Sequence, residues 1–269
     1  IMYHYIRELR LTRFPGIKAL LESEFKNQLE YLEKFYEFVT MDECIDSIYN
    51  GTELPRNAAL LTFDDAYIDH FNSVFPILNE KKISGCFFPP AQAIIERKVL
   101  DVNKIHFILA SVDDPRKIVK EINKYLDYHR ADFKLKSNEY YYSQHAKKHP
   151  WMNENDSIDI VFIKTMLQVE LQESLRNNIV DDLFKKYVSD SEESFARELY
   201  MDINQIKCMV RNGMYFGSHG FTHYWLSSLD KIAQKKEISL SLEFLNSVGA
   251  KTTDWSMCYP KGSYTDLLI

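Results

Sequence analysis

Residues 58–65 read AALLTFDD, and this stretch decides the fold class. A largely apolar run of strand length, 58–63, leads directly into two adjacent carboxylates, Asp64 and Asp65. Continuous apolar runs are typical of strands buried on both faces, as in parallel sheets that helices cover on each side. Ligands bind at the carboxyl ends of such strands, so the two carboxylates lie where a functional site is expected.

The sequence on both sides of this strand alternates between helical and strand-like patterns. Helical patterns cover about 22–38, 41–49, 68–82, 202–212 and 230–248, and strand-like runs cover 1–5, 85–88, 214–217 and 255–259. A strand–helix–strand alternation predicts a parallel sheet with helices outside it. The chain is therefore expected to be an α/β protein.

The segment at about 100–200 differs from the rest of the chain. It is charged, rich in tyrosine and helix-patterned. We therefore expect a single domain over 1–269 that carries a long helical insertion, rather than two independent domains. An aromatic cluster in the insertion, tyrosines 140–142 with His145 and Trp151, is open to two interpretations: a lid that stacks on sugar, or ordinary packing.

Composition and charge argue against several classes of protein. The 269 residues carry a net charge of −6 with Lys and Arg spread along the chain, which argues against a nucleic-acid partner. The four cysteines form no CxxC pair and are interpreted as free thiols in a reducing compartment. No apolar run reaches the roughly 18 residues of a transmembrane helix, and the first residues do not resemble a signal peptide, so the cytoplasm is favoured over the periplasm. Because the chain begins with Ile1 rather than Met, a missing N-terminal piece stays an open alternative, and nothing indicates the oligomeric state.

A pair of histidines follows another predicted strand. His219 and His223 stand four residues apart in the segment SHGFTH, 218–223. On a helical turn this spacing would place both imidazoles on one face, where they can reach the same ion. Together with Asp65 they make a set of two histidines and one carboxylate, which leaves coordination positions open for water and substrate.

A tight turn follows the last predicted strand. Pro260 and Gly262 flank Lys261 within CYPKGSY, 258–264. Such a turn presents backbone N–H groups that can donate to a developing oxyanion. Without the other two motifs, it would be interpreted as an ordinary turn.

In this order, the three motifs resemble those of the polysaccharide deacetylase family, carbohydrate esterase family four. The family's TFDD motif is matched by 62–65, its Ser/Thr-His motif with a second His four residues on by 218–223, and its aromatic-Pro-x-Gly turn by 259–262. The resemblance covers about the first hundred and the last seventy residues, but not the segment between them. It implies that the fold is a distorted, seven-stranded (β/α) barrel.

The resemblance also implies a role for each motif residue. These roles are Asp64 as general base, Asp65, His219 and His223 as ligands of one divalent metal ion, and Tyr259, Pro260 and Lys261 as a substrate-binding turn whose Lys261 N–H donates to the oxyanion. Two imidazoles and a carboxylate suit zinc, and also cobalt, nickel or manganese. The implied reaction is hydrolysis of an N-acyl group, usually N-acetyl, on an amino sugar or polysaccharide.

His4 is the candidate general acid. Members similar to the poly-N-acetylglucosamine deacetylases have a permuted motif order and open with a Tyr-His strand, whose His acts as the acid. Residues 2–5, MYHY, resemble this element, so His4 is expected to protonate the leaving amine. The alternative is a strand His bonded to a carbonyl. The other histidines, His70 among them, are assigned surface or core positions.

Four features depart from the family pattern. Ala66 replaces the usual Gly after the paired carboxylates, so a left-handed turn there would be strained. Cys258 replaces an Arg that orients the base, and Gly220 replaces a frequent Thr. The sequence also ends at Ile269, before the segment in which many members carry a catalytic His.

The expected function is metal-dependent N-deacetylation of an amino sugar, in the synthesis of a bacterial surface polysaccharide such as capsule or lipopolysaccharide. Three alternatives stay open. The first is deformylation of a lipid-linked or nucleotide-linked sugar. The second is a catalytically weak carbohydrate-binding protein, which Ala66 and Cys258 make conceivable. The third is an unrelated metalloprotein, in which the three motifs would not converge in space.

Overall fold

The computed structural model describes residues 1–145 and 156–265. Contacts divide the chain into two compact units. We call Ile1–Leu9, Lys18–Lys98 and Glu193–Ile269 the sheet unit, and Arg10–Ile17 with Val99–Glu192 the helical unit. The described residues of the helical unit form no strand. The prediction of one domain with an insertion stays a prediction.

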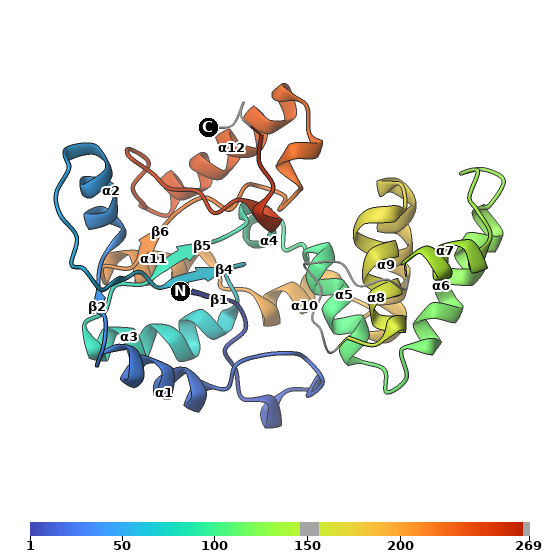
Figure 1. Ribbon diagram of the computed structural model, residues 1–269, viewed down its shortest axis with the longest axis horizontal. Coiled ribbons are helices and arrows are strands. Elements are labelled where there is room, and N and C mark those ends of the chain that lie inside the picture. Colours follow the sequence, from blue (N-terminus) through green and yellow to red (C-terminus); the bar gives the residue numbers. More distant parts are fainter. Residues whose placement is uncertain (146–155, 266–269) are drawn as a thin grey trace. The chain divides into compact units, whose positions relative to one another are not determined.

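The sheet unit is built on a parallel sheet of four strands in the order β1-β4-β5-β6 (Figure 1). The strands are β1 (Met2–Tyr3), β4 (Thr62–Asp64), β5 (Cys86–Phe88) and β6 (Tyr215–Phe216). Each strand pairs with its neighbour in parallel. The predicted α/β fold with a parallel sheet is therefore confirmed.

One row of aromatic side chains crosses all four strands. Tyr3, Phe63, Phe87 and Phe216 are in register with one another. Consecutive rings stack with their centroids 5.4, 4.8 and 5.4 Å apart, and all four side chains are buried. Cross-strand aromatic pairs stabilise a sheet beyond the area they bury. This aromatic row therefore fixes the register of the strands, and with it the position of the residues that follow them.

The seven-stranded barrel that the resemblance implies is not confirmed. Among the described residues the four-stranded sheet does not close, and β2 (Glu37–Phe38) pairs with β3 (Ala58–Ala59) in a separate sheet. The predicted strand at 255–259 is reduced to a single parallel bridge between Met257 and Ser218. Within the described part of the chain, this segment makes two backbone hydrogen bonds to the segment after β6, and both involve Ser218: its N–H donates to the Ser256 carbonyl, and its carbonyl accepts from the Cys258 N–H.

Helices occupy the segments between the strands. Those of the sheet unit are α1 (Glu22–Leu32), α2 (Met41–Asn50), α3 (Phe75–Lys81), α4 (Ala91–Ile95), α10 (Glu192–Leu199), α11 (Ile203–Arg211) and α12 (Lys231–Ser247). Sequence signals set their ends: the Thr40 hydroxyl accepts a hydrogen bond from the Glu43 N–H at the start of α2, which ends at Gly51 in the left-handed region. No helix that the structure describes is long and apolar enough to cross a membrane.

Two predicted helices differ from the structure. The pattern over 22–38 predicts one helix, whereas α1 ends at Leu32 and Glu37–Phe38 pairs with another strand. Pairing between distant segments overrides helical periodicity there. The pattern over 68–82 begins instead as a π-helical turn, His70–Val74, which continues into α3.

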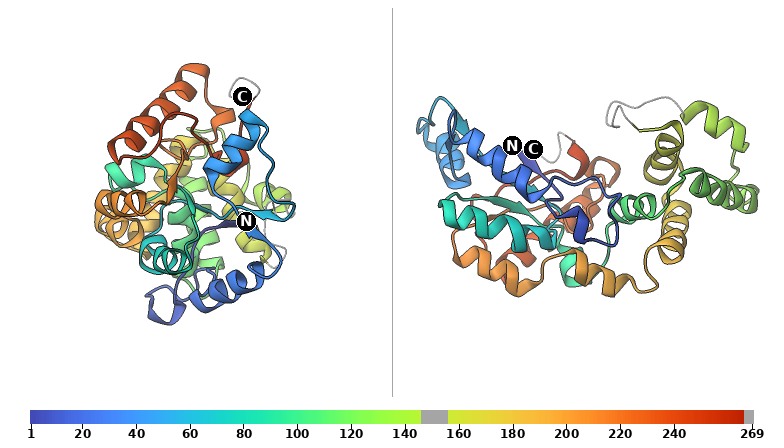
Figure 2. Two further views of the ribbon diagram at one scale, coloured as in Figure 1. Left: turned by 90° about the vertical axis from the view of Figure 1, so that its left-hand side faces the viewer. Right: turned by 90° about the horizontal axis from the view of Figure 1, so that it is seen from below.

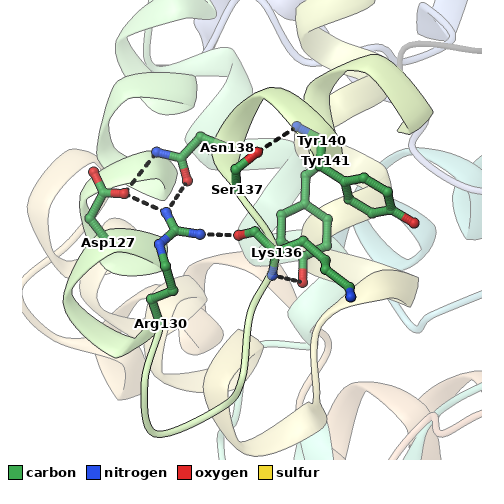
Figure 3. A network of polar contacts seen from close by, with 7 residues as sticks. All are labelled: Asp127, Arg130, Lys136, Ser137, Asn138, Tyr140 and Tyr141. Atoms are coloured by element: carbon green, nitrogen blue, oxygen red, sulfur yellow. Dashed lines mark hydrogen bonds and ion pairs between the residues drawn. The ribbon is translucent and has the colours of Figure 1, made fainter.

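The helical unit is described by its own contacts. Its helices are α5 (Asp101–Ala110), α6 (Arg116–His129), α7 (Asn138–His145), α8 (Ile158–Thr165) and α9 (Glu173–Tyr187), which gather into one group (Figure 2, right). Arg130 ties the end of α6 to the start of α7. Its guanidinium lies between the side chains of Asp127 and Asn138 and also donates to the Lys136 carbonyl (Figure 3).

Two tyrosines of the predicted aromatic cluster pack within the helical unit, whereas Tyr140 is exposed. Tyr141 is buried, and Tyr142 donates a hydrogen bond of 2.9 Å to Asp159 of α8. These contacts favour ordinary packing over a sugar-stacking lid for both tyrosines. Trp151 lies outside the described residues.

Candidate metal centre

The three predicted metal ligands converge at the carboxyl ends of β4 and β6. Asp65 directly follows β4, and His219 follows β6 in a loop that continues to His223. The Nε2 atoms of His219 and His223 each lie 3.5 Å from Oδ1 of Asp65. The side chains of Asp65, His219 and His223 are only 5%, 3% and 10% exposed. The structure thus brings these three residues together around one buried point.

The Asp65 carboxylate has one satisfied and one unsatisfied oxygen. Oδ2 accepts a hydrogen bond of 2.6 Å from the Tyr67 hydroxyl. Oδ1 is buried without a hydrogen-bond partner among the described residues, between the two histidine Nε2 atoms. A buried, unpartnered carboxylate oxygen costs free energy unless a cation or donor compensates it. Two imidazole nitrogens and this oxygen therefore fit a divalent metal ion.

The His219 ring is oriented by the backbone of the third motif. Its Nδ1 lies 2.7 Å from the Cys258 carbonyl oxygen, so Nδ1–H donates there and the lone pair of Nε2 faces Asp65. Burial alone would lower the pKa of His219, but the Asp65 carboxylate and the Cys258 side chain raise it well above its ordinary value. A histidine ligand must be neutral, so binding of a divalent ion would displace the proton that this raised pKa favours.

The surroundings of the other two candidate ligands, His223 and Asp65, favour the protonation states that metal binding needs. Burial lowers the pKa of His223 to about 3, so this ring is neutral and can ligate a metal near neutral pH. For Asp65, burial would raise the pKa, but the neighbouring His219 and His223 rings lower it below its ordinary value. Asp65 is therefore charged at all pH values at which the protein would work.

The two histidines do not lie on a helical turn, so that prediction was wrong. Residues 219–223 form an irregular loop in which Gly220 has φ of 73° and His223 has φ of 65°. Left-handed residues prevent an α-helix, and the loop instead folds around the carboxylate of Glu237. The two rings still meet, with their centroids 4.8 Å apart.

The left-handed turn after the paired carboxylates is present. Asp65 and Ala66 have φ of 70° and 56°. Each non-glycine residue in this region costs about 1 kcal/mol, so the strain expected from Ala66 in place of Gly is accepted here. The Ala66 carbonyl is held by the Met201 N–H at 2.9 Å.

Asp64, the predicted base, lies beside the triad. It ends β4 and is buried, and its Oδ2 accepts a hydrogen bond of 3.3 Å from the Cys258 thiol. Its Oδ1 has no hydrogen-bond partner among the described residues. Burial raises the pKa of Asp64, an effect that the nearby His219 and His4 partly offset. A buried carboxylate with one open oxygen is suited to accept a proton.

His4, the predicted acid, is exposed at the same edge of the sheet. It follows β1 and is among the groups that influence the pKa of Asp64, Asp65 and His223. Its backbone is fixed by His70, whose Nε2 donates a hydrogen bond of 2.9 Å to the His4 carbonyl. His70 is fully buried, in agreement with a core position.

The predicted turn at the third motif is formed. Pro260–Gly262 make a single 3₁₀ turn, and Lys261 and Gly262 have φ of 57° and 64°. The Lys261 ammonium lies 4.8 Å from the centre of the Trp225 ring, a cation–π contact. The ring of Tyr259 packs against that of Tyr264. The turn therefore carries an aromatic and cationic surface.

Three residues of the centre were missed or undervalued from the sequence. Tyr67 bonds Asp65, Glu237 holds the histidine loop, and Cys258 contacts both Asp64 and His219 through different atoms. Only Glu237 left a usable signal, because a carboxylate occupies a position on α12 that helical periodicity assigns to the buried face.

Residues 183–269 match a family model described as polysaccharide deacetylase. This part of the chain is similar to the polysaccharide deacetylase family. The match contains the histidine motif and the Pro-x-Gly turn, so the resemblance drawn from the three motifs is confirmed.

Several solved structures share the fold of this chain. The Streptococcus pyogenes deacetylase PplD in complex with acetate aligns with 99% of this chain and 74% of its own, at a TM-score of 0.55 and 15% identity. IcaB from Ammonifex degensii aligns with 99% and 76%, at 0.51 and 19%. A de-N-acetylase from Aggregatibacter actinomycetemcomitans aligns with 99% and 80%, at 0.50 and 14%. Such low identities show the fold alone. No curated protein sequence matches the chain significantly.

Proposed function

We propose that this chain is a divalent-metal-dependent hydrolase that removes an N-acetyl group from an amino sugar within a polysaccharide. One observation carries the proposal: the unpartnered Oδ1 of Asp65 lies 3.5 Å from two imidazole Nε2 atoms, with the Asp64 carboxylate next to it. The family match supports the substrate class, and similar structures include a deacetylase with acetate and a de-N-acetylase. An unrelated metalloprotein is disfavoured because the three motifs meet in one place.

The metal ion would be held by Asp65, His219 and His223. This mixed nitrogen and oxygen donor set suits zinc, with cobalt, nickel and manganese as alternatives. When bound, the ion supplies Lewis-acid chemistry to the acyl oxygen and to water. Tyr67 and the Cys258 carbonyl would orient the ligands through their hydrogen bonds.

The remaining steps are assigned to groups of the chain itself. Asp64 takes a proton from the water that attacks the acetyl carbon, and the Lys261 N–H donates to the oxygen on which charge develops. The C–N bond then breaks, and His4 gives a proton to the leaving amine. The products are acetic acid, which ionises to acetate near neutral pH, and a free amino sugar. The proton on Asp64 returns through solvent to His4, so the atoms and protons of one water and one amide are accounted for.

Two finer proposals accompany the activity. The substrate belongs to a bacterial surface polysaccharide or its precursor, as the family resemblance suggests, and a cytoplasmic location stays a prediction. The sheet corresponds to part of a seven-stranded barrel. Two isolated parallel bridges, Ile6–Leu20 and Ser218–Met257, mark where further strands would pair.

The test combines metal content with acetate release from N-acetylated glucosamine oligomers. We expect wild type to bind about one zinc ion and to release acetate. Asp65→Ala should lose the ion, whereas Asp64→Asn should keep the ion and lose turnover by a factor of at least about 100. The matched control, Asp42→Asn, alters an exposed carboxylate and should leave both unchanged.

Each other outcome has a distinct meaning. A wild type that binds no divalent metal would overturn the proposal. Metal binding with formate release from N-formyl sugars, and no acetate release, would identify a deformylase. Metal and oligosaccharide binding without release of any acyl group would indicate the carbohydrate-binding alternative.

A further inference from the structure

One face of α12 is polar where a packed helix is normally apolar. Gln234, Glu237 and Ser241 are 5%, 8% and 0% exposed, and their spacing of three and four residues puts them on one side of the helix. We call these three side chains the α12 polar stripe. Buried polar groups persist where partners satisfy them, so the stripe must face other polar groups.

Every member of the α12 polar stripe bonds the segment that carries the histidine ligands. The Gln234 amide donates to the Leu226 carbonyl at 2.8 Å, and the Ser241 hydroxyl lies 2.8 Å from the Ser218 hydroxyl. These contacts fix the two ends of the segment, on either side of the metal ligands. The middle is held by Glu237.

Glu237 receives three hydrogen bonds from residues between the two histidines. Its Oε2 accepts from the N–H groups of Phe221 at 2.9 Å and Thr222 at 2.8 Å, and its Oε1 accepts from the Thr222 hydroxyl at 2.8 Å. Hydrogen bonds to a charged, buried acceptor are about twice as strong as neutral ones. This carboxylate therefore replaces the backbone hydrogen bonds that a helical turn would have made.

The loop geometry is matched to this carboxylate. Gly220 has φ of +73°, and a Cβ there would lie 3.3 Å from Oε2 of Glu237, which is closer than an ordinary contact. A glycine at this position lets the chain wrap around the carboxylate, so the departure from the frequent Thr has a structural use. The loop then reaches His223, whose left-handed φ of 65° needs support from its surroundings.

We propose that Glu237 is a positioning residue for the metal centre, and that it sets metal affinity by fixing loop 220–222. Its three hydrogen bonds hold His219 and His223 at the separation that places both Nε2 atoms 3.5 Å from Oδ1 of Asp65. An apolar side chain at residue 237 would fill a similar volume but leave the N–H groups of Phe221 and Thr222 without this acceptor. The inference rests on the proposed function, because it concerns the same metal site.

The experiment is a titration of the metal-free full chain with Co²⁺, followed by visible absorption, which reports both the dissociation constant and the ligand geometry. Glu237→Ala is expected to weaken binding by roughly 10- to 100-fold, as is typical when a group that orients a ligand is lost. Glu237→Gln keeps an acceptor for the two N–H groups and should lie between wild type and Glu237→Ala, with an altered cobalt spectrum. Glu243→Ala, an exposed carboxylate on the same helix, is the matched control and should behave as wild type.

Thermal unfolding of the metal-free variants separates positioning from general support of the fold. If Glu237 only supports the fold, Glu237→Gln will unfold at a lower temperature, but its cobalt dissociation constant will lie within about threefold of that of Glu243→Ala and its cobalt spectrum will be unchanged. That result would overturn the inference. If Glu237→Ala does not fold, Glu237→Gln decides alone. A wild type that binds no cobalt would refute the proposed function itself, whereas intact binding in both Glu237 variants would refute only the role of Glu237.

Discussion

At the scale of single residues, the metal centre contains backbone conformations and buried polar atoms that are unfavourable in free energy. Asp65, Ala66 and His223 have left-handed backbone conformations, and one oxygen each of Asp64 and Asp65 is buried without a partner among the described residues. Such strain persists where the surrounding structure imposes it, and it clusters at functional sites. Cys258 illustrates how the surroundings do this: its carbonyl orients His219 while its thiol bonds Asp64.

His70 predicts a loss of stability in mild acid. Burial lowers the pKa of His70 to about 4, whereas the pKa of a histidine in the unfolded chain is about 6.5. Between these values the unfolded chain binds the proton more tightly, so the free energy of unfolding is highest above about pH 6.5 and falls as the pH drops toward about 4. The full shift corresponds to roughly 3 kcal/mol.

Urea unfolding of wild type and His70→Gln at several pH values between 7.5 and 4.5 measures this effect. The Gln amide can still donate to the His4 carbonyl but does not titrate. We expect a shallower pH dependence in the variant than in wild type. Parallel curves for the two proteins would contradict the assignment of the acid loss to His70.

At the scale of elements, the aromatic row joins β1, β4, β5 and β6 through consecutive ring contacts. Phe87 lies in the middle of this row and stacks on a ring at both sides. Phe87→Ala should lower the free energy of unfolding by about 3–5 kcal/mol, because it leaves a cavity and removes two ring contacts. Phe35→Ala, at an exposed phenylalanine, should cost less than about 1 kcal/mol. Chemical denaturation compares the two, and similar losses would show that the row is not special.

Elements were predictable where local pattern and tertiary environment agree. The apolar run 58–63 divides into β3, which pairs with β2, and β4 (Thr62–Asp64) of the parallel sheet, with Leu61 and Phe63 fully buried. The motif carboxylates stand at the end of β4, as the sequence predicted for a strand of a parallel sheet. The helical turn at 219–223 was predicted wrongly. Its conformation is set by Glu237, which follows fourteen residues after His223 and whose contact no local pattern reveals.

At the scale of the whole molecule, all predicted site residues belong to the sheet unit. The sequence could predict that they share one sheet edge, since strands in parallel order collect their carboxyl ends there. It could not predict the number of strands or the open sheet, because two- and three-residue strands leave little periodicity to detect.

Metal binding should therefore stabilise the two units unequally. An ion that binds only the folded state stabilises it by about 2.7 kcal/mol when its free concentration is 100 times the dissociation constant. We expect added zinc to slow hydrogen exchange in strands β4 and β5 but to leave exchange in α5 and α9 of the helical unit unchanged. Chelator should reverse the effect. Equal protection of both units, or of neither, would contradict the location of the site in the sheet unit.

The aromatic row also has a consequence for synthesis on the ribosome. Phe87 finds its neighbour on β6, Phe216, only after about 130 further residues have been made. At roughly 5–20 residues per second, the apolar edge of β5 stays uncovered for several seconds or more. An unpaired, apolar strand edge is a template for pairing with another chain. The nascent protein is thus most prone to aggregate before its last sheet strand emerges, and that is the interval in which a chaperone would be of use.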